Sequence, residues 1–142
     1  MVNKDTKRVD FYAGGFLYNP KTQSVLLHLR DNKTTIHPNE WGFFGGKNEG
    51  VESPKACFAR ELNEELGIKI NEGEIKDLCN YFNKDRGTRR HVFYVESGLD
   101  KSRMTLSEGA NFDWIPLNNV FEYDLTKKTR QDLKMFVSRG NK

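Results

Sequence analysis

Residues 46–68 restrict the fold of this chain more than any other part of its sequence. Ser53-Pro54 predicts a helix start, because a hydroxyl can accept an N–H of the first turn and proline has no N–H to leave unpaired there. The helical pattern continues to Leu66, and Gly67 is typical of the position just after a helix. At about 100° per residue, one side of this helix carries three carboxylates, those of Glu61, Glu64 and Glu65.

The acidic side of this helix predicts a divalent metal site. Carboxylates on one helix face repel each other even when exposed, so a partly buried helix needs cations beside it. The segment offers oxygen ligands and no clustered His or Cys, a donor set that suits Mg²⁺ or Mn²⁺. The opposite side, where a core would pack, carries Ala59, Leu62 and Leu66. The alternative is an ordinary solvated acidic face, which leaves the pattern around the helix unexplained.

That surrounding pattern resembles the signature of the Nudix hydrolases at every fixed position. Five residues separate Gly46 from Glu52, and seven more precede the run Arg-Glu-Leu-Asn-Glu-Glu-Leu-Gly-Ile at residues 60–68. Seven specified residue types give a chance match on the order of 10⁻⁸ or less per starting position. The resemblance implies the Nudix fold, an α/β (α+β) architecture in which a mixed β-sheet lies between α-helices. It also implies one domain over residues 1–142 and an enzyme that uses Mg²⁺ or Mn²⁺.

The resemblance assigns expected roles to the residues of this segment. The Gly45 carbonyl, Glu61 and Glu65 would be metal ligands, and Glu64 would be a ligand or the general base. Arg60 belongs to the catalytic group, and with Glu52 it would brace the loop against the helix and orient the ligands. Gly46 and Gly67 would have structural roles.

A further carboxylate is expected downstream of the helix. Glu108-Gly109 precedes the pattern Asp-Trp-Ile-Pro-Leu at residues 113–117, which resembles the loop that supplies an extra carboxylate in many Nudix enzymes. Glu108 would then be a metal ligand or the general base that activates water. The alternative is a solvated loop glutamate. The choice of base between Glu64 and Glu108 stays open.

The remainder of the chain has a strand-rich pattern. Alternating or apolar runs bounded by turn residues predict strands at residues 9–18, 24–29, 75–82, 89–95 and 111–115. Residues 31–40 read as a polar loop that leads into Trp41-Gly42-Phe43-Phe44. A second helix is expected at residues 126–138, with Leu133, Phe136 and Val137 on its apolar side.

Charge and composition exclude several classes of partner. A net charge of +3 is too small to indicate nucleic acid as the main partner. No apolar run approaches the length of a membrane-spanning helix, and the first eight residues show no secretory signal. Cys57 and Cys79 lack metal-site spacing and indicate free thiols in a reducing cytoplasm. A homodimer is possible, since dimers are common among these folds.

The substrate is less well determined than the family. The expected reaction converts a nucleoside triphosphate to the monophosphate and pyrophosphate. Alternatives are hydrolysis of an NDP-sugar, ADP-ribose or a dinucleoside polyphosphate, or a non-catalytic module that binds nucleotide or RNA. Phe43-Phe44 stands where many relatives acting on oxidised purine triphosphates have Phe-Pro, and residues 125–129 lack the Asn of that group. No proline occurs between Pro54 and Pro116, where relatives acting on ADP-ribose commonly carry one.

Several side chains outside the motif are candidates for binding the substrate. The candidate residues are Arg30, Phe43, Phe44, Arg89 and His91. Strand alternation predicts that one of Arg89 and Arg90 points inward and the other to solvent. The alternatives are a solvated basic turn for the arginines and ordinary core packing for the aromatic residues.

Overall fold

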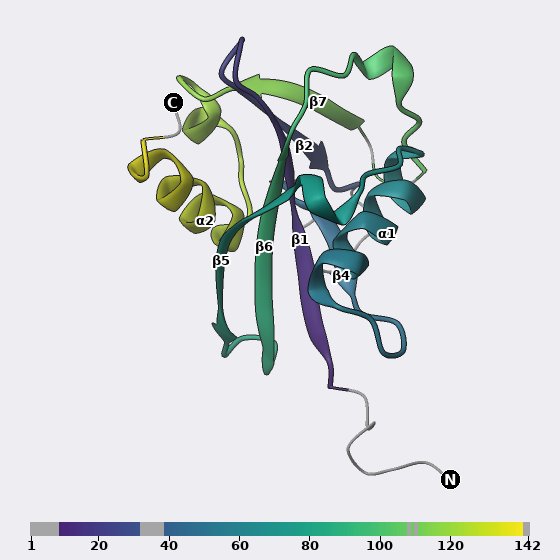
Figure 1. Cartoon of the computed structure of the whole chain (residues 1–142). Coiled ribbons are helices and arrows are strands. Elements are labelled where there is room, and N and C mark those ends of the chain that lie inside the picture. Colours follow the sequence, from purple (N-terminus) through teal and green to yellow (C-terminus); the bar gives the residue numbers. More distant parts are fainter. Residues whose placement is uncertain (1–8, 32–38, 108, 110, 141–142) are drawn as a thin grey trace, which may run out of the picture.

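The computed structural model describes residues 9–31, 39–107, 109 and 111–140. Its strands form one seven-stranded sheet (Figure 1). The strands follow the order β3-β2-β1-β6-β5, with β4 paired to β1 and β7 paired to β2. The β1–β6 pair is parallel and the other pairs are antiparallel, so the sheet is mixed. The strands are β1 (Phe11–Asn19), β2 (Ser24–Leu29), β3 (Trp41–Gly42), β4 (Phe44–Lys47), β5 (Ile75–Asn83), β6 (Thr88–Glu96) and β7 (Asn111–Pro116).

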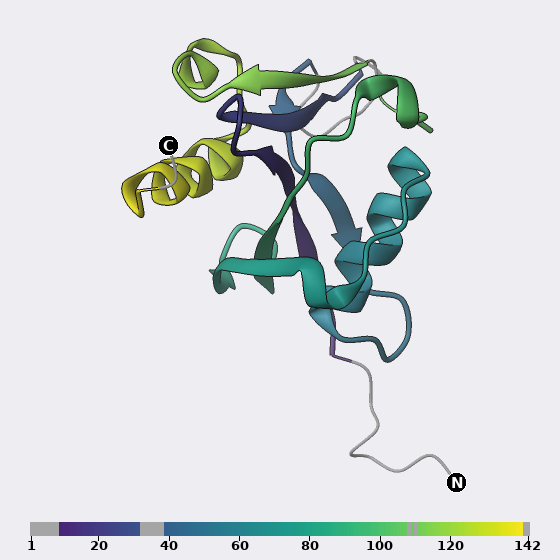
Figure 2. The same ribbon diagram turned by 45° about the horizontal axis from the view of Figure 1, so that its top comes forward.

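Two α-helices lie on opposite sides of this sheet, as Figures 1 and 2 show. The first is α1 (Pro54–Leu66), which the Ser53 side chain caps by accepting the Ala56 N–H, and which ends at Gly67 in the left-handed region. The second is α2 (Lys127–Ser138), capped by Thr126. Three short 3₁₀ helices complete the described elements: η2 (Glu72–Glu74), η3 (Lys101–Arg103) and η4 (Val120–Glu122). The predicted fold class, a mixed sheet between helices, is confirmed.

The hydrophobic core has two halves, one on each face of the sheet. Alternation along β1 sends Leu17 toward α1 and Phe16 toward α2. The α1 half includes Phe44, Phe58, Leu62 and Phe93, and the α2 half includes Val25, Phe43, Leu133 and Phe136. Neither α-helix in the described ranges combines the length and apolar character needed to cross a bilayer.

The buried sides of both helices contain two of the three predicted residues each, with Ala59 and Val137 as the exceptions. On α1 the buried apolar residues are Cys57, Phe58, Leu62 and Leu66, whereas Ala59 is only partly buried. On α2 the buried side includes Asp132 together with Leu133 and Phe136, and Val137 is only half-buried. The reason is the same in both helices: docking on the sheet selects the face that fits the strands, and polar groups with partners can be part of it.

Both cysteines are free thiols, Cys57 buried on α1 and Cys79 half-buried on β5. Burial, the largest cause, raises the pKa of Cys57 to about 12 and that of Cys79 to about 11. Neither thiol is therefore set up as a nucleophile at neutral pH.

Candidate active site

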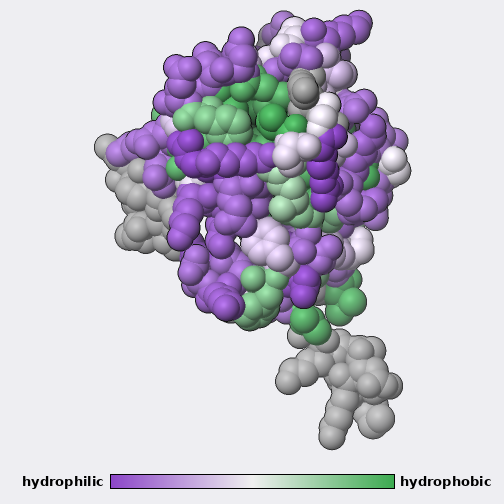
Figure 3. All heavy atoms as spheres, turned by 90° about the vertical axis from the view of Figure 1, so that its left-hand side faces the viewer, coloured by the Kyte–Doolittle hydropathy of each residue, from purple (hydrophilic) through white to green (hydrophobic). Residues whose placement is uncertain are grey.

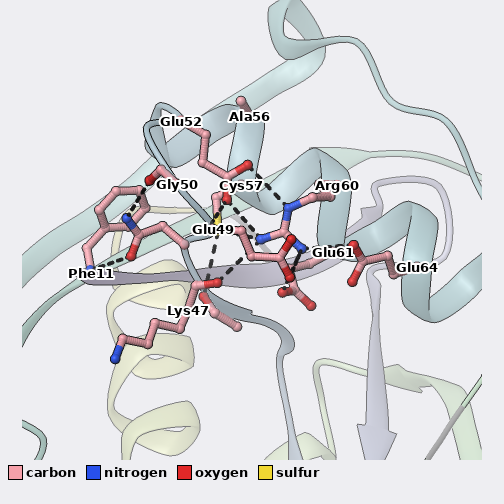
Figure 4. A network of polar contacts seen from close by, with 12 residues as sticks. Phe11, Lys47, Glu49, Gly50, Glu52, Ala56, Cys57, Arg60, Glu61 and Glu64 are labelled. Atoms are coloured by element: carbon pink, nitrogen blue, oxygen red, sulfur yellow. Dashed lines mark hydrogen bonds and ion pairs between the residues drawn. The ribbon is translucent and has the colours of Figure 1, made fainter. Parts of the chain in front are cut away.

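Arg60 on α1 is the centre of a polar network that ties the loop after β4 to the helix (Figure 4). Its Nη2 and Nε donate to the two carboxylate oxygens of Glu52 at 2.8 and 3.2 Å, a bidentate pair. Nη2 also donates to the Lys47 carbonyl at 3.3 Å, and Nη1 donates to Glu64 at 2.9 Å. The Arg60 side chain is 22% exposed and that of Glu52 17%, so this pair is largely shielded from water.

The Arg60–Glu52 pair shifts the titration of both partners. The hydrogen bonds from Arg60 are the largest cause that lowers the pKa of Glu52 to about 2, and the same bonds raise the pKa of Arg60 above its ordinary value. Because the folded-state pKa of Glu52 is depressed, its contribution to stability is complete above the unfolded-state pKa and disappears as the pH falls toward 2.

We predict that Glu52→Gln lowers the free energy of unfolding by about 1–3 kcal/mol at neutral pH, since it removes charged hydrogen bonds. The difference from the wild type should shrink between about pH 5 and pH 2, because the Glu52 carboxylate binds a proton in the unfolded state over this range, whereas in the folded protein it does so only near pH 2. Urea unfolding across this range measures it, with the exposed surface variant Glu96→Gln as control. A difference that stays constant down to pH 3 would contradict the role of the Glu52 charge.

Glu61 and Glu65 lie against the backbone of β4 at two consecutive glycines. Glu65 Oε2 accepts the Gly45 N–H at 3.0 Å, and the Glu65 side chain is buried although it belongs to the predicted acidic side. A Cβ at Gly46 would come within 2.5 Å of Glu61 Oε2, so only glycine lets this carboxylate approach the strand. Gly45 has φ of +150°, a backbone conformation that side chains disfavour. The absence of side chains at Gly45 and Gly46 thus explains how the Glu61 and Glu65 carboxylates can both lie beside β4.

Glu64 is oriented differently from its two neighbours. Its side chain is 51% exposed, compared with 14% for Glu61, although Arg60 Nη1 donates to both carboxylates, at 2.9 Å to Glu64 and 3.3 Å to Glu61. Accordingly, the described residues contain no ready cluster of three acidic, His or Cys side chains around one point. Glu108 lies outside the described residues. The roles predicted for the three carboxylates of α1 therefore stay predictions, and docking of the helix buries Glu65 while it leaves Glu64 exposed.

The donor chemistry nevertheless fits a hard divalent cation. Because Gly45 and Gly46 have no side chains, the Glu61 and Glu65 carboxylates lie close to the strand, where their oxygens are suitable donors for such a cation. The Gly45 carbonyl belongs to the same stretch of β4. Rotation of the exposed Glu64 side chain away from Arg60 would add a further carboxylate to this set.

A cavity of about 260 Å³, here called the acidic-site cavity, opens beside Gly45 and Glu65. Tyr12, Arg30 and Phe43 also line it. Burial raises the pKa of the Tyr12 hydroxyl, the Arg90 charge opposes that shift, and the Glu65 carboxylate adds to it. The phenol therefore stays protonated and can donate a hydrogen bond toward anionic groups.

His28 also lines this cavity and was not among the predicted site residues. It is buried on β2, and its ring stacks on Phe44 with the centroids 5.2 Å apart. Burial and the neighbouring Arg30 charge lower its pKa, which keeps the imidazole neutral at pH 7. A histidine inside the apolar run of β2 was the available signal in the sequence.

A second cavity, of about 400 Å³, adjoins the first and shares Tyr12 and Arg30 with it. Arg90 on β6 lines this cavity, with its guanidinium carbon 4.6 Å from the centroid of the Tyr12 ring. Arg90 Nε donates to Asp132 Oδ2 at 2.9 Å, and the Tyr81 hydroxyl donates to Asp132 Oδ1 at 2.8 Å. Asp132 is fully buried. This network was not predicted from the sequence. Its only indication in the sequence was Asp132, an acidic residue next to the apolar residues of α2.

The structure brings some of the predicted substrate-binding residues to these cavities and not others. Arg30 and Phe43 line the acidic-site cavity. Phe44 is fully buried in the core, and Arg89 is exposed and donates to Asn80 at 2.8 Å. His91 lines a separate cavity near the start of α1. The predicted alternation holds, with Arg90 as the inward member of the arginine pair.

Comparison with known proteins assigns the family. The family model described as the NUDIX domain matches residues 10–137, which is most of the chain. This chain belongs to the Nudix family. It is 25% identical over 121 residues to the nucleoside triphosphatase NudI of Escherichia fergusonii, a match that covers 78% of this chain and 85% of that protein. It is 29% identical over 106 residues to the 8-oxo-dGTP diphosphatase of Proteus vulgaris, covering 75% and 90% respectively.

Solved Nudix structures share the fold. A MutT structure, from work on the enzymes of Aliivibrio salmonicida and Vibrio cholerae, superposes with a TM-score of 0.77 at 19% identity, covering 93% of this chain and 99% of that one. The NUDIX domain of Shewanella oneidensis NrtR, solved with ADP ribose, gives 0.72 at 21% identity, covering 98% and 93%. The family assignment and the hydrolase relatives make this chain a Nudix hydrolase, a class of enzyme that generally uses divalent metal ions.

Proposed function

We propose that this Nudix hydrolase is a Mg²⁺- or Mn²⁺-dependent pyrophosphohydrolase that converts a nucleoside triphosphate and water to the monophosphate and pyrophosphate. The observation that carries the proposal is the placement of Glu61 and Glu65 on the Gly45-Gly46 backbone, beside a cavity that continues into a larger one. Relatives named as a nucleoside triphosphatase and an 8-oxo-dGTP diphosphatase support this substrate class. The two adjoining cavities share Tyr12 and Arg30 and together offer space for an extended ligand such as a nucleotide.

The residues of the chain have distinct tasks in this reaction. When bound, a divalent cation supplies charge that stabilises the attacked phosphate and the leaving group. Glu61, Glu65 and the Gly45 carbonyl would hold it, and Arg60 would keep the loop and helix in register through its bonds to Glu52. Arg30 reaches the same cavity and would bind phosphate oxygens.

The general base is Glu64 or Glu108 in this proposal. Glu64 accepts a hydrogen bond from Arg60 through Oε2 at 2.9 Å, and its second carboxylate oxygen would accept the proton from water. Glu108 would act from the loop before β7. Single replacements distinguish the two, because loss of the base lowers kcat and changes its pH dependence, whereas loss of a bystander changes neither.

The test is chromatographic separation of the nucleotide products from a nucleotide panel with Mg²⁺ or Mn²⁺, together with release of phosphate and pyrophosphate. The panel contains canonical and oxidised nucleoside triphosphates, NDP-sugars, ADP-ribose, NADH and dinucleoside polyphosphates, with Glu65→Gln as the control. Glutamate-dependent turnover of the triphosphates supports the proposal. Hydrolysis of only one of the other kinds of compound would show that the proposed substrate class is wrong and would identify the correct one. If the protein is folded and binds metal but hydrolyses none of these compounds, nucleotide or RNA binding without turnover is favoured.

A further inference from the structure

Arginine and lysine side chains line much of the larger cavity, and we call it the basic cavity. It lies where the first residues of β1, the turn between β5 and β6, and the start of α2 meet. The face that carries α2 and β5 is covered mainly by hydrophilic side chains (Figure 3). Among the described residues, no carboxylate lines this cavity. Its cationic lining residues are Arg30, Lys47, Arg86, Arg90 and Lys128.

Most uncharged polar groups of the basic cavity already have structural partners. Asn83 Oδ1 accepts the Asp85 N–H at 3.1 Å within the β5–β6 turn. The Thr126 hydroxyl accepts the Thr129 N–H at 3.2 Å and donates to the Thr129 hydroxyl at 2.8 Å, which caps α2. Reading the edge of a neutral base would need amide or hydroxyl groups that are free to pair. The cations are therefore the main groups that this wall can offer a ligand.

The carboxylates that pair with Arg90 and Lys128 are not among the residues that line the basic cavity. Arg90 pairs with the buried Asp132 at 2.9 Å, and Lys128 approaches the exposed Asp85 at 3.8 Å. Arg86 has no ion pair with any described residue. Water screens the exposed pairs strongly, so they neutralise these side chains only partly. A phosphate group carries up to two negative charges and suits the fork geometry of arginine.

The basic cavity is also connected to the chemistry. Tyr12 and Arg30 line both cavities, so a ligand can extend from Glu65 past the Tyr12 ring to Arg86 and Lys128. We propose that the basic cavity binds a second phosphate of the substrate, one that lies beyond the anhydride to be hydrolysed. This inference rests on the proposed function, and it assigns the basic cavity to a phosphate group in addition to the two that the hydrolysed anhydride joins. The group can be a phosphate ester on the ribose or a further phosphate in the 5′ chain.

Binding of four adenine nucleotides tests this proposal and separates the two sources. Titration calorimetry without metal compares ADP, its 2′-phosphate, its 3′-phosphate, and ATP, the last carrying the extra phosphate in line. At least one of the phosphorylated ligands should bind roughly tenfold more tightly than ADP, which corresponds to about 1.4 kcal/mol. Preference for a ribose phosphate identifies an ester, and preference for ATP alone identifies the longer chain. Equal binding of all four ligands would overturn the proposal.

A pair of double variants shows whether the preference arises in the basic cavity. Arg86→Gln with Lys128→Gln removes two cations of its wall, and the preference over ADP should fall below about threefold. Lys76→Gln with Arg103→Gln removes the same charge from exposed positions outside both cavities and should leave the preference unchanged. An equal loss in both double variants would mean general attraction of anions and would overturn the assignment. Circular dichroism verifies folding of each.

Hydrolysis of the same ligands separates this inference from the proposed function. With metal added, Glu65-dependent turnover of ATP without any binding preference would retain the proposed function and reject the second phosphate site. A binding preference that the basic-cavity variants abolish, without turnover of any ligand, would retain the site and reject the proposed function.

Discussion

Replacing Glu65 with glutamine is expected to lower kcat by roughly 10³-fold, because loss of about 4 kcal/mol of metal-mediated stabilisation has this effect. The free energy of unfolding should change little. Glu65 Oε2 accepts the Gly45 N–H at 3.0 Å, and the amide oxygen of glutamine can accept the same bond. Glu61→Gln should lower kcat comparably, since the Glu61 carboxylate occupies the neighbouring position at Gly46. Steady-state kinetics with Mg²⁺ or Mn²⁺, combined with urea unfolding, measures both effects.

Glu96→Gln is the matched control for these variants, because Glu96 is an exposed carboxylate on β6 that pairs with Lys76 at 3.1 Å. It should leave kcat unchanged. Metal binding provides a readout independent of turnover, and Mn²⁺ affinity followed by electron paramagnetic resonance should fall in both site variants. Turnover within about threefold of the wild type for Glu65→Gln would reject the metal assignment, since a ligand loss cannot be so small.

Replacing Asp132 with alanine is expected to lower the free energy of unfolding by about 3–5 kcal/mol, because breaking a buried ion pair leaves an uncompensated charge. Asp132 is fully buried and Arg90 nearly so, with 2.9 Å between their bonded atoms. The Tyr81 hydroxyl loses its acceptor in the same variant. Urea unfolding gives the difference, and Asp132→Asn should cost less because the amide oxygen can still accept one hydrogen bond.

Asp85→Ala tests whether burial accounts for this cost. Asp85 also pairs with a cation, Lys128 at 3.8 Å, but its side chain is 69% exposed. Its loss should cost less than about 1 kcal/mol, as is usual for an exposed pair. If Asp132→Ala were as mild as Asp85→Ala, the buried network would not support the wall of the basic cavity.

Most of the fold could be predicted from the sequence, and the errors have local causes. Ser53 and Gly67 delimit α1 through groups within a few residues, so its ends are readable without tertiary information. The predicted strand at residues 9–18 is β1 at Phe11–Asn19, and the short strands β3 (Trp41–Gly42) and β4 (Phe44–Lys47) had no predicted bounds. The Nudix motif was recognisable because its fixed positions lie within 23 residues, at residues 46–68.

The sequence alone determined that Glu61, Glu64 and Glu65 would project from one side of a helix, because the helical repeat fixes these angles over short distances. Only the tertiary structure decided which carboxylate meets the strand: docking of α1 buries Glu65 against Gly45 and leaves Glu64 with Arg60. The same holds for Arg90 and Asp132, which are 42 residues apart. Sheet register and helix docking bring such distant groups together, and neither is encoded in the spacing of any single segment.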